Sequence, residues 1–333
     1  MDELSMDMGA TLPTMACKVC QNTMGNSIYR VREMMFGLRE SFAYLECSKC
    51  HCVQLVDAPA DMSKYYPPEY YSLSESPEEI FNNPIKNWLG GLRTLYGATN
   101  RGVVGKILYS RKPDPRAHLL AEAGITHDTR ILDVGCGSGI FLYMLRNAGF
   151  ANTMGIDPYI HETITYKNGL TIYKQAIHEM RGEWDLIMFH HAYEHVPDPL
   201  ETLVSTARLL APGGVCLIRI PVSSSYAWEH YRTNWVQLDA PRHYFLHTVA
   251  SMSLLASQAG LTLDQVIYDS TEFQFWGSEQ YQRDIPLNAP QSYKNDPQHS
   301  IFAPEDIAAF RQQAEELNQR GMGDQAAFYL RKR

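Results

Sequence analysis

Residues 130–139 read RILDVGCGSG, and this short stretch decides the fold. Its first half, up to Val134, predicts a buried strand, and its three glycines predict a turn that opens a helix from Ile140 to Gly149. Glycines in such a turn let the backbone approach a ligand without a side-chain clash, and the first amides of the helix can donate hydrogen bonds to a carboxylate. The stretch therefore predicts an α/β domain with a ligand site at this turn.

The spacing within the turn narrows the class of ligand. The third glycine follows the second by two residues, whereas in the dinucleotide fingerprint it follows by three, which argues against a nicotinamide dehydrogenase. A second strand, 153–157, ends at Asp157, whose carboxylate could accept hydrogen bonds from both hydroxyls of an adenosine ribose. The alternative for Asp157 is an ordinary turn aspartate before Pro158.

Further strands follow at the spacing of a doubly wound sheet. A third strand, 171–175, leads to Ala176 and Ile177, where apolar walls could hold an adenine. A fourth strand is expected over 184–191, then a helix over 198–210 and a fifth strand over 215–221. We expect a helix over 248–260 and two last strands over 261–268 and 272–276.

The set of motifs resembles the class I S-adenosylmethionine-dependent methyltransferases over residues 115–270. The motifs are D-x-G-x-G-x-G after a strand, the later Gly-Ile-Asp, the Trp-Asp-Leu-Ile strand, Glu-His-Val and Leu-Leu-Ala-Pro-Gly-Gly. The resemblance implies a Rossmann-like, seven-stranded methyltransferase sheet and S-adenosyl-L-methionine as cofactor. It also implies the cofactor-binding residues Asp133, Gly135, Cys136, Gly137 and Gly139 for the methionine end, Asp157 for the ribose, Ala176 and Ile177 for the adenine, and His190 for the sulfonium side.

If the methyl acceptor is a hydroxyl, a base must take its proton, and a histidine tuned near neutrality suits this task. His195 follows the fourth strand at the sheet edge where ligands gather, and His243 lies in the long segment that could cover the same edge. The alternatives are a structural hydrogen bond for His195 and loop packing for His243. Glu194 is a candidate for substrate binding, and Arg242 could clamp an anionic substrate group or pair with Asp239.

Two aromatic segments could cover a substrate. In the loop YYPPEYY, residues 65–71, Tyr71 is a catalytic candidate and Tyr70 a substrate-binding one, although such loops also pack domains together. The insertion at 222–247 carries four large aromatic side chains that suit stacking on a sugar or packing of a lid, namely Tyr226, Trp228, Tyr231 and Trp235.

The first 62 residues are expected to form a zinc ribbon. The metal ligands would be the thiolates of two C-x-x-C knuckles separated by 26 residues, Cys17 and Cys20 in the first and Cys47 and Cys50 in the second. Four protein thiolates leave no open position, so the Zn²⁺ would be structural. One alternative is that the thiols are redox-active or merely buried. Another is a different set of metal ligands at the second knuckle that includes His51 or Cys52.

The remaining segments connect these units. Residues 63–112 are expected to be a tyrosine-rich and helical linker, 113–285 the methyltransferase domain, and 286–333 a C-terminal helical appendage with a helix over 304–320. Apolar positions at helical spacing in 77–111 predict packing between domains, with contact to a membrane surface or a partner as the alternative.

The composition of the chain limits the classes of partner that it can bind. The chain of 333 residues has a net charge of −8, which argues against broad binding of nucleic acid, and contains no apolar run near the length of a membrane span. The N-terminus lacks a signal-peptide pattern, so a cytoplasmic protein, with a homodimer as an open alternative, is expected.

The two-knuckle domain and the core together are similar to sugar and secondary-metabolite methyltransferases. This implies a saccharide, nucleotide sugar or glycan as acceptor, with O-methylation expected and C-methylation as the alternative. An rRNA methyltransferase with a zinc-binding domain and a non-catalytic cofactor-binding scaffold are the rival functions.

Overall fold

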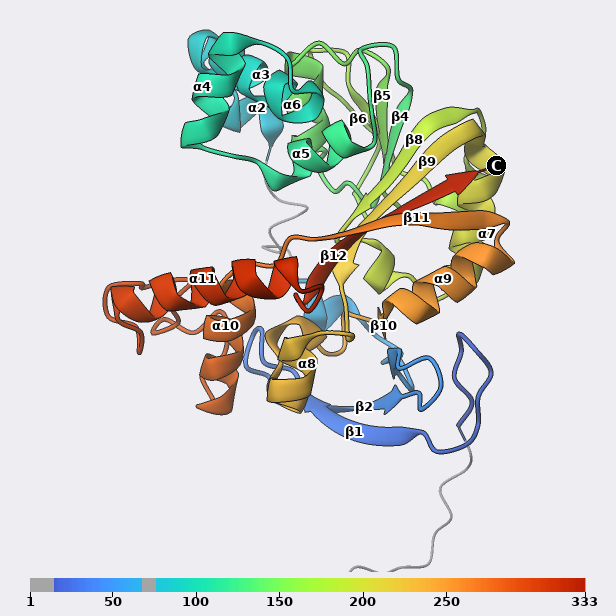
Figure 1. Ribbon diagram of the computed structural model, residues 1–333, viewed down its shortest axis with the longest axis vertical. Helices are drawn as coiled ribbons and strands as arrows, with labels where there is room; N and C mark the ends of the chain where they lie inside the picture. The colour runs from blue at the N-terminus through green and yellow to red at the C-terminus, as the bar shows by residue number, and fades with distance from the viewer. Residues whose placement is uncertain (1–14, 68–75, 333) are drawn as a thin grey trace, which may run out of the picture.

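The computed structural model describes residues 15–67 and 76–332 (Figure 1). A central sheet crosses the molecule in the strand order β11-β12-β9-β8-β4-β5-β7-β6. Its strands are β4 (Ile131–Val134), β5 (Thr153–Ile156), β6 (Ile164–Thr165), β7 (Thr171–Tyr173), β8 (Trp184–His190), β9 (Leu210–Pro221), β11 (Leu261–Tyr268) and β12 (Gln325–Lys332). The five strands β7, β5, β4, β8 and β9 are parallel neighbours, whereas β12 is antiparallel to β9 and to β11. This is the expected Rossmann-like α/β sheet, with the two-residue β6 added at its edge.

Helices cover both faces of the sheet, because successive side chains of a buried strand point to opposite faces. Leu186 and Met188 of β8 pack on one side, and Ile187 and Phe189 pack on the other. The first side is covered by α5 (Pro115–Glu122) and α6 (Ile140–Asn147), and the second by α7 (Pro199–Leu209) and α9 (Val249–Gln258). Figure 1 shows α2 (Pro77–Ile80), α3 (Pro84–Thr99) and α4 (Val103–Arg111) gathered with α5 and α6 at one end of the molecule.

The C-terminal segment corrects the expected boundary at residue 285. It contains the expected helix, α11 (Pro304–Gln319), but its last residues form β12 between β9 and β11, where Phe328 pairs with Ile218 on one side and Val266 on the other. The segment 272–276, expected as a strand, belongs instead to α10 (Phe273–Gln282). A short apolar run does not distinguish a strand from a buried helix, and which run enters the sheet depends on long-range pairing.

A second, small sheet holds the N-terminal region, in the order β1 (Ser27–Arg32), β2 (Ser41–Glu46), β3 (Val53–Leu55) and β10 (Phe245–Leu246). The last strand comes from the long segment after β9, with Phe245 opposite Gln54. Cysteines of the knuckles share a core with Phe245 and with Met252 of α9. The N-terminal unit is therefore not residues 1–62 alone, because its sheet and core include parts of the methyltransferase region.

The aromatic insertion packs against this small sheet through α8 (Tyr226–Tyr231). Trp228, Tyr231 and Trp235 are buried, and the two indole N–H groups donate to Glu46 Oε1 at 3.0 Å and Asp324 Oδ2 at 2.9 Å. Of the two functions considered for these rings, packing is the one observed, and stacking on a sugar is not supported.

Short 3-10 helices complete the fold: η1 (Ser63–Tyr65), η2 (Ile177–Glu179), η3 (Tyr193–His195), η4 (Arg232–Asn234) and η5 (Val236–Leu238). The helix η3 directly follows β8 at the carboxyl edge of the parallel strands, where α/β folds place ligands. In the part of the chain that the structure describes, no helix is both long enough and apolar enough to cross a bilayer.

Candidate functional site

The glycine turn lies between β4 and α6 and has room only for glycine at two positions. Gly135 has φ +71°, and a Cβ there would lie 2.6 Å from the Cβ of Ala192. Gly139 has φ +76°, and a Cβ there would meet the side chain of Ile172 at 2.6 Å. A side chain at either position would be both strained and in collision. The contact with Ala192 also places the segment after β8 directly against the turn.

Asp157 closes the turn from the end of β5. Its Oδ2 accepts from the backbone N–H of Gly137 at 2.9 Å, and its Oδ1 accepts from the N–H of Tyr159 at 2.8 Å. Burial raises the pKa of the carboxyl, and these two hydrogen bonds oppose the rise. Each oxygen keeps a second lone pair, so the carboxylate is held in place and can still accept from the hydroxyls of a ligand.

Polar atoms without partners mark where the ligand would fit. In residues 15–67 and 76–332, Oδ1 of Asp133 and both ring nitrogens of His190 are buried and make no hydrogen bond. Burial raises the pKa of Asp133 to about 8; Arg116 opposes this rise, and Asp157 adds to it. Buried acceptors are costly unless paired, so these atoms fit a ligand that brings donors and positive charge.

The other predicted cofactor residues lie around the same edge. Cys136 packs its sulfur toward β5, where a Cβ on Gly155 would approach it to 2.4 Å. Ala176 and Ile177 are at the start of η2, and the side chain of Ile177 is buried in the core.

Two histidines meet beyond this edge. The rings of His195 and His243 are 4.7 Å apart, edge to face. His195 Nδ1 is 2.9 Å from the carbonyl oxygen of Arg242, and His243 Nδ1 is 2.8 Å from the carbonyl oxygen of Gln237. A carbonyl oxygen only accepts, so both imidazoles carry the proton on Nδ1 and keep a lone pair on Nε2. His195 is the more accessible of the two, because His243 is buried.

Glu194 is a buried carboxylate in the same cluster. His191 Nε2 lies 2.8 Å from Arg219 Nη1, which can only donate, so His191 Nδ1 carries a proton that it donates to Glu194 Oε1 at 3.2 Å. Burial would raise the pKa of Glu194, but this hydrogen bond and the electrostatic influence of the neighbouring imidazoles of His195, His191 and His243 lower it to about 2. The residue is therefore ionised beside the histidines, with Oε1 at 4.0 Å from His243 Nε2.

Arg242 is fully buried in a network of ion pairs. Its guanidinium donates to Asp239 and to Glu33 Oε1, at 3.0 Å, and to the carbonyl oxygen of Tyr65 at 3.3 Å. The pairing with Asp239 considered from the sequence is present, whereas a side chain with no exposed surface does not clamp a substrate. Arg242 instead ties the histidine segment to the N-terminal sheet and to η1.

Tyr70 and Tyr71 lie outside the residues that the structure describes. Their neighbour Tyr66, which the sequence did not single out, places its hydroxyl 3.3 Å from His195 Nδ1. His191 was missed as well. The spacing of three residues between His191 and Glu194 after a strand was the only signal that could have indicated their contact.

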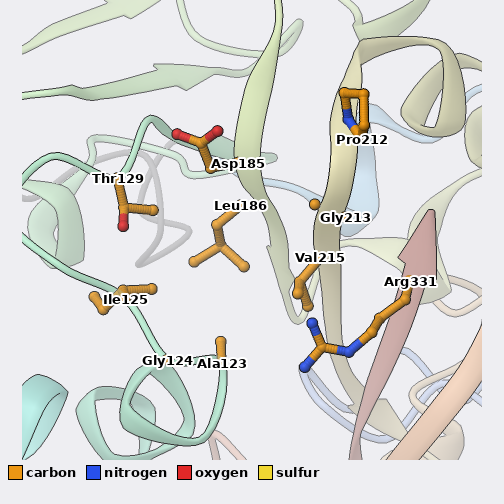
Figure 2. Close-up of a pocket in the computed structure, with 11 residues that line it drawn as sticks. Ala123, Gly124, Ile125, Thr129, Asp185, Leu186, Pro212, Gly213, Val215 and Arg331 are labelled. Atoms are coloured by element: carbon orange, nitrogen blue, oxygen red, sulfur yellow. The ribbon is translucent and has the colours of Figure 1, made fainter. Parts of the chain in front are cut away.

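A pocket of about 200 Å³ lies elsewhere, lined by Ala123, Asp185 and Arg331 among others (Figure 2). It opens at the amino end of β8, where Leu186 and Val215 pair. Ligands of parallel α/β sheets bind at the opposite, carboxyl edge, so this pocket does not belong to the candidate site.

The four predicted metal ligands come together at the edge of the small sheet. The sulfur atoms of Cys17, Cys20, Cys47 and Cys50 all lie within 4.8 Å of one another. Cys17 and Cys50 are 3.6 Å apart, and Cys20 and Cys47 are 3.4 Å apart. Zn–S bonds of about 2.3 Å in a tetrahedron require sulfur atoms about 3.8 Å apart, so the cluster fits this ion. Cys52 is buried outside the cluster, at 3.8 Å from His247 Nδ1.

The burial of His243 predicts a pH dependence of stability. Burial lowers its pKa to about 4, helped by His195 and opposed by Asp239 and Glu194. Between pH 6.5 and 4 the unfolded chain binds the proton more tightly than the folded one, so stability is lost as the pH falls. We expect a loss of roughly 2–3 kcal/mol from this residue between pH 6.5 and 4.5. Urea unfolding at several pH values measures it.

The variant His243→Gln is the matched comparison for this pH series, because other buried histidines also titrate. Subtracting its curve from that of the wild type isolates the contribution of His243. If the free energy of unfolding depends on pH in the same way in both proteins, the pKa of His243 does not differ between the folded and unfolded chain as expected.

The parallel sheet, the glycine turn and the acidic residue at the end of β5 define a class I S-adenosylmethionine-dependent methyltransferase. Residues 107–266 match the family described as "Methyltransferase domain".

Two of its curated relatives are ubiquinone biosynthesis O-methyltransferases. The one from Psychrobacter arcticus is 29% identical over 47% of this chain and 68% of its own length. The one from Bordetella avium is 32% identical over 42% of this chain and 64% of its own length. Among solved structures, an S-adenosylmethionine-dependent methyltransferase from Mesorhizobium loti covers 66% of this chain and 99% of its own, at 16% identity and a TM-score of 0.40.

Replacing Asp157 tests the cofactor site. We expect Asp157→Ala to weaken S-adenosylmethionine binding by at least about 100-fold, because two hydrogen bonds to a carboxylate contribute about 1.5–3 kcal/mol each. Isothermal titration calorimetry measures the change. Asp157→Asn keeps an oxygen for the N–H groups of Gly137 and Tyr159 and is expected to lose less affinity. Unchanged binding in the alanine variant would contradict the assignment of Asp157.

Proposed function

We propose that the protein transfers a methyl group from S-adenosylmethionine to a hydroxyl group of a small molecule, with His195 as the base. The single observation that carries this proposal is the cluster after β8, in which a half-buried imidazole with a free Nε2 lies beside the ionised Glu194. The names of the curated relatives, which are O-methyltransferases, support an oxygen acceptor.

Each group of residues at the site has a separate role in methyl transfer. S-adenosylmethionine supplies a methyl group on a sulfonium, whose sulfur is the leaving group. Asp133, Asp157 and the glycine turn hold and orient the donor. His195 Nε2 takes the proton of the acceptor hydroxyl as the O–C bond forms and the S–C bond breaks. The negative charge of Glu194 stabilises the imidazolium that results, and His243 keeps the ring of His195 in place.

The acceptor would enter between the cofactor edge and the histidines. Tyr66 places its hydroxyl 3.3 Å from His195 Nδ1, and a phenol beside the proposed base suits a ring compound as the acceptor. A hydroxylated aromatic ring related to the quinols is therefore our first candidate, and the saccharide class expected from the sequence is the second.

We also propose that the four thiolates bind one structural Zn²⁺. The donor set leaves no coordination position for water or a substrate, so the ion would stabilise the N-terminal sheet without taking part in methyl transfer.

A panel of acceptors tests the function. Purified protein is incubated with donor labelled in the methyl group and with quinols and catechols, nucleotide sugars, glycans and RNA. We expect label in a hydroxylated small molecule and stoichiometric release of S-adenosylhomocysteine. Label in RNA alone would overturn the proposal, and binding of the donor without transfer to any acceptor would favour a scaffold.

A further inference from the structure

Five large apolar side chains on α3 and α4 are exposed in the part of the chain that the structure describes. They are Ile85 and Trp88 on α3, exposed by 71% and 63%, and Val103, Val104 and Ile107 on α4, exposed by 78%, 52% and 52%. Ile85 and Trp88 are three residues apart, and so are Val104 and Ile107, so each pair shares a helix face. The sequence pattern predicted that these positions pack between domains, and this is wrong for the five residues of this α3–α4 surface.

Other positions of these helices are used for packing inside the protein. A Cβ on Gly91 would meet the backbone oxygen of Asn147 on α6 at 2.5 Å, and a Cβ on Gly105 would meet the backbone oxygen of Leu92 at 2.4 Å. The absence of side chains at these glycines therefore lets α3 pack closely against α6, and α4 pack closely against α3. Figure 1 shows the pair at the outer end of the molecule, away from the small sheet of β1 and β2. The apolar residues are left pointing outward by this packing.

The same helices carry unpaired positive charge. Five cations on α3, α4 and their connections are exposed: Lys86, Arg101, Lys106, Arg111 and Lys112. None of them forms an ion pair with another residue of the described ranges. The sequence from Ile80 to Pro113 contains no aspartate or glutamate, although the whole chain has a net charge of −8. The charge of this surface is therefore opposite to that of the protein.

We propose that the α3–α4 surface docks peripherally on a membrane of anionic phospholipids. Aliphatic side chains and a tryptophan on one face, flanked by lysine and arginine, are the composition of helices that lie in the membrane interface. Each cation near an anionic bilayer contributes about fivefold to binding, and the apolar residues add insertion below the headgroups. A second copy of the chain is disfavoured as the occupant, because two such surfaces would bring like charges together.

Flotation with lipid vesicles tests the proposal. The full chain is mixed with vesicles of phosphatidylglycerol and phosphatidylcholine, or of phosphatidylcholine alone, at low and high salt. We expect binding only to the anionic vesicles, and less of it at high salt. Reversing two charges in Lys106→Glu/Lys112→Glu is expected to weaken binding at least about 25-fold. Trp88→Ser/Val103→Ser is expected to abolish binding at both salt concentrations.

Matched controls lie on other surfaces. Arg320→Glu reverses an exposed charge at the end of α11, and Val204→Ser removes an apolar side chain that is 49% exposed on α7. Both are expected to bind vesicles like the wild type. None of the altered residues lies in the methyl-transfer site, so transfer to a water-soluble acceptor should stay within about twofold. This activity separates a failed membrane proposal from a failed enzyme assignment.

Three results would overturn the proposal: equal binding to neutral and anionic vesicles, no binding of the wild type at low salt, or unchanged binding of the Trp88→Ser/Val103→Ser variant. A fourth such result would come from light scattering. If the wild type is a dimer that does not bind vesicles, and Trp88→Ser converts it to a monomer, the α3–α4 surface joins two copies of the chain instead.

Discussion

Cys50→Ala is expected to abolish metal binding and to unfold the small N-terminal sheet. The free energy of binding a structural Zn²⁺ through thiolates is also folding free energy, on the order of 10 kcal/mol in small zinc domains. Cys50 contacts Cys17, and its carbonyl oxygen accepts from Thr248 Oγ1 at 2.7 Å, so the second knuckle is joined to the start of α9. Loss of the ion would release both sides of this contact.

We expect methyl transfer to be lost with the metal, although no thiolate takes part in the reaction. The small sheet includes β10, which begins two residues after His243. Tyr44 of β2 also donates its hydroxyl proton to the carbonyl oxygen of His243 at 2.8 Å. When the sheet loosens, the histidine segment loses its anchor. Zinc content, thermal unfolding and methyl transfer measured on one preparation test this sequence of effects.

Cys52→Ala is the matched control. Cys52 is as buried as the ligands but lies outside the cluster, so the variant should retain one zinc ion per chain and lose only the packing of its sulfur. Zinc retained in Cys50→Ala and lost in Cys52→Ala would show that the metal uses the alternative set of ligands that includes Cys52. Disulfide formation in place of metal binding would support redox-active thiols.

His195→Ala is expected to lower kcat for an oxygen acceptor by about 100- to 10,000-fold, the usual contribution of a positioned base. S-adenosylmethionine affinity should change little, because His195 lies outside the glycine turn. The variant is assayed at saturating donor and acceptor, so that kcat and KM are separated. A rate within a fewfold of the wild type would contradict the role of His195 as base.

His243→Ala separates the base from its neighbour. Because His243 is buried against His195 and Glu194, we expect a smaller loss of kcat together with a lower melting temperature. His299, which is exposed beside Asp296, provides a surface control, and His299→Ala should have wild-type activity. A greater loss of kcat in His243→Ala than in His195→Ala would exchange the two roles.

Much of the sheet could be predicted because its signals are local. The strand, glycine turn and helix at residues 131–147 are contiguous, and the positive φ angles of Gly135 and Gly139 explain why these residues stand there. The four cysteines were found by spacing alone, since pairs of cysteines with two residues between them are a feature of zinc knuckles. Long-range partners could not be found in this way, because Arg242 pairs with Glu33 across more than two hundred residues.

By itself the sequence determined the class of fold, the glycine turn and the cysteine pairs that form the cluster, because each depends on residues that are close in the chain. Only the tertiary structure decided that β12 enters the central sheet, that Arg242 is buried, and that His191 orients Glu194. It also decided that Trp88 faces outward, since helical spacing marks an apolar face but not whether another element covers it. Burial and pairing depend on which distant segments meet, and that is a property of the whole fold.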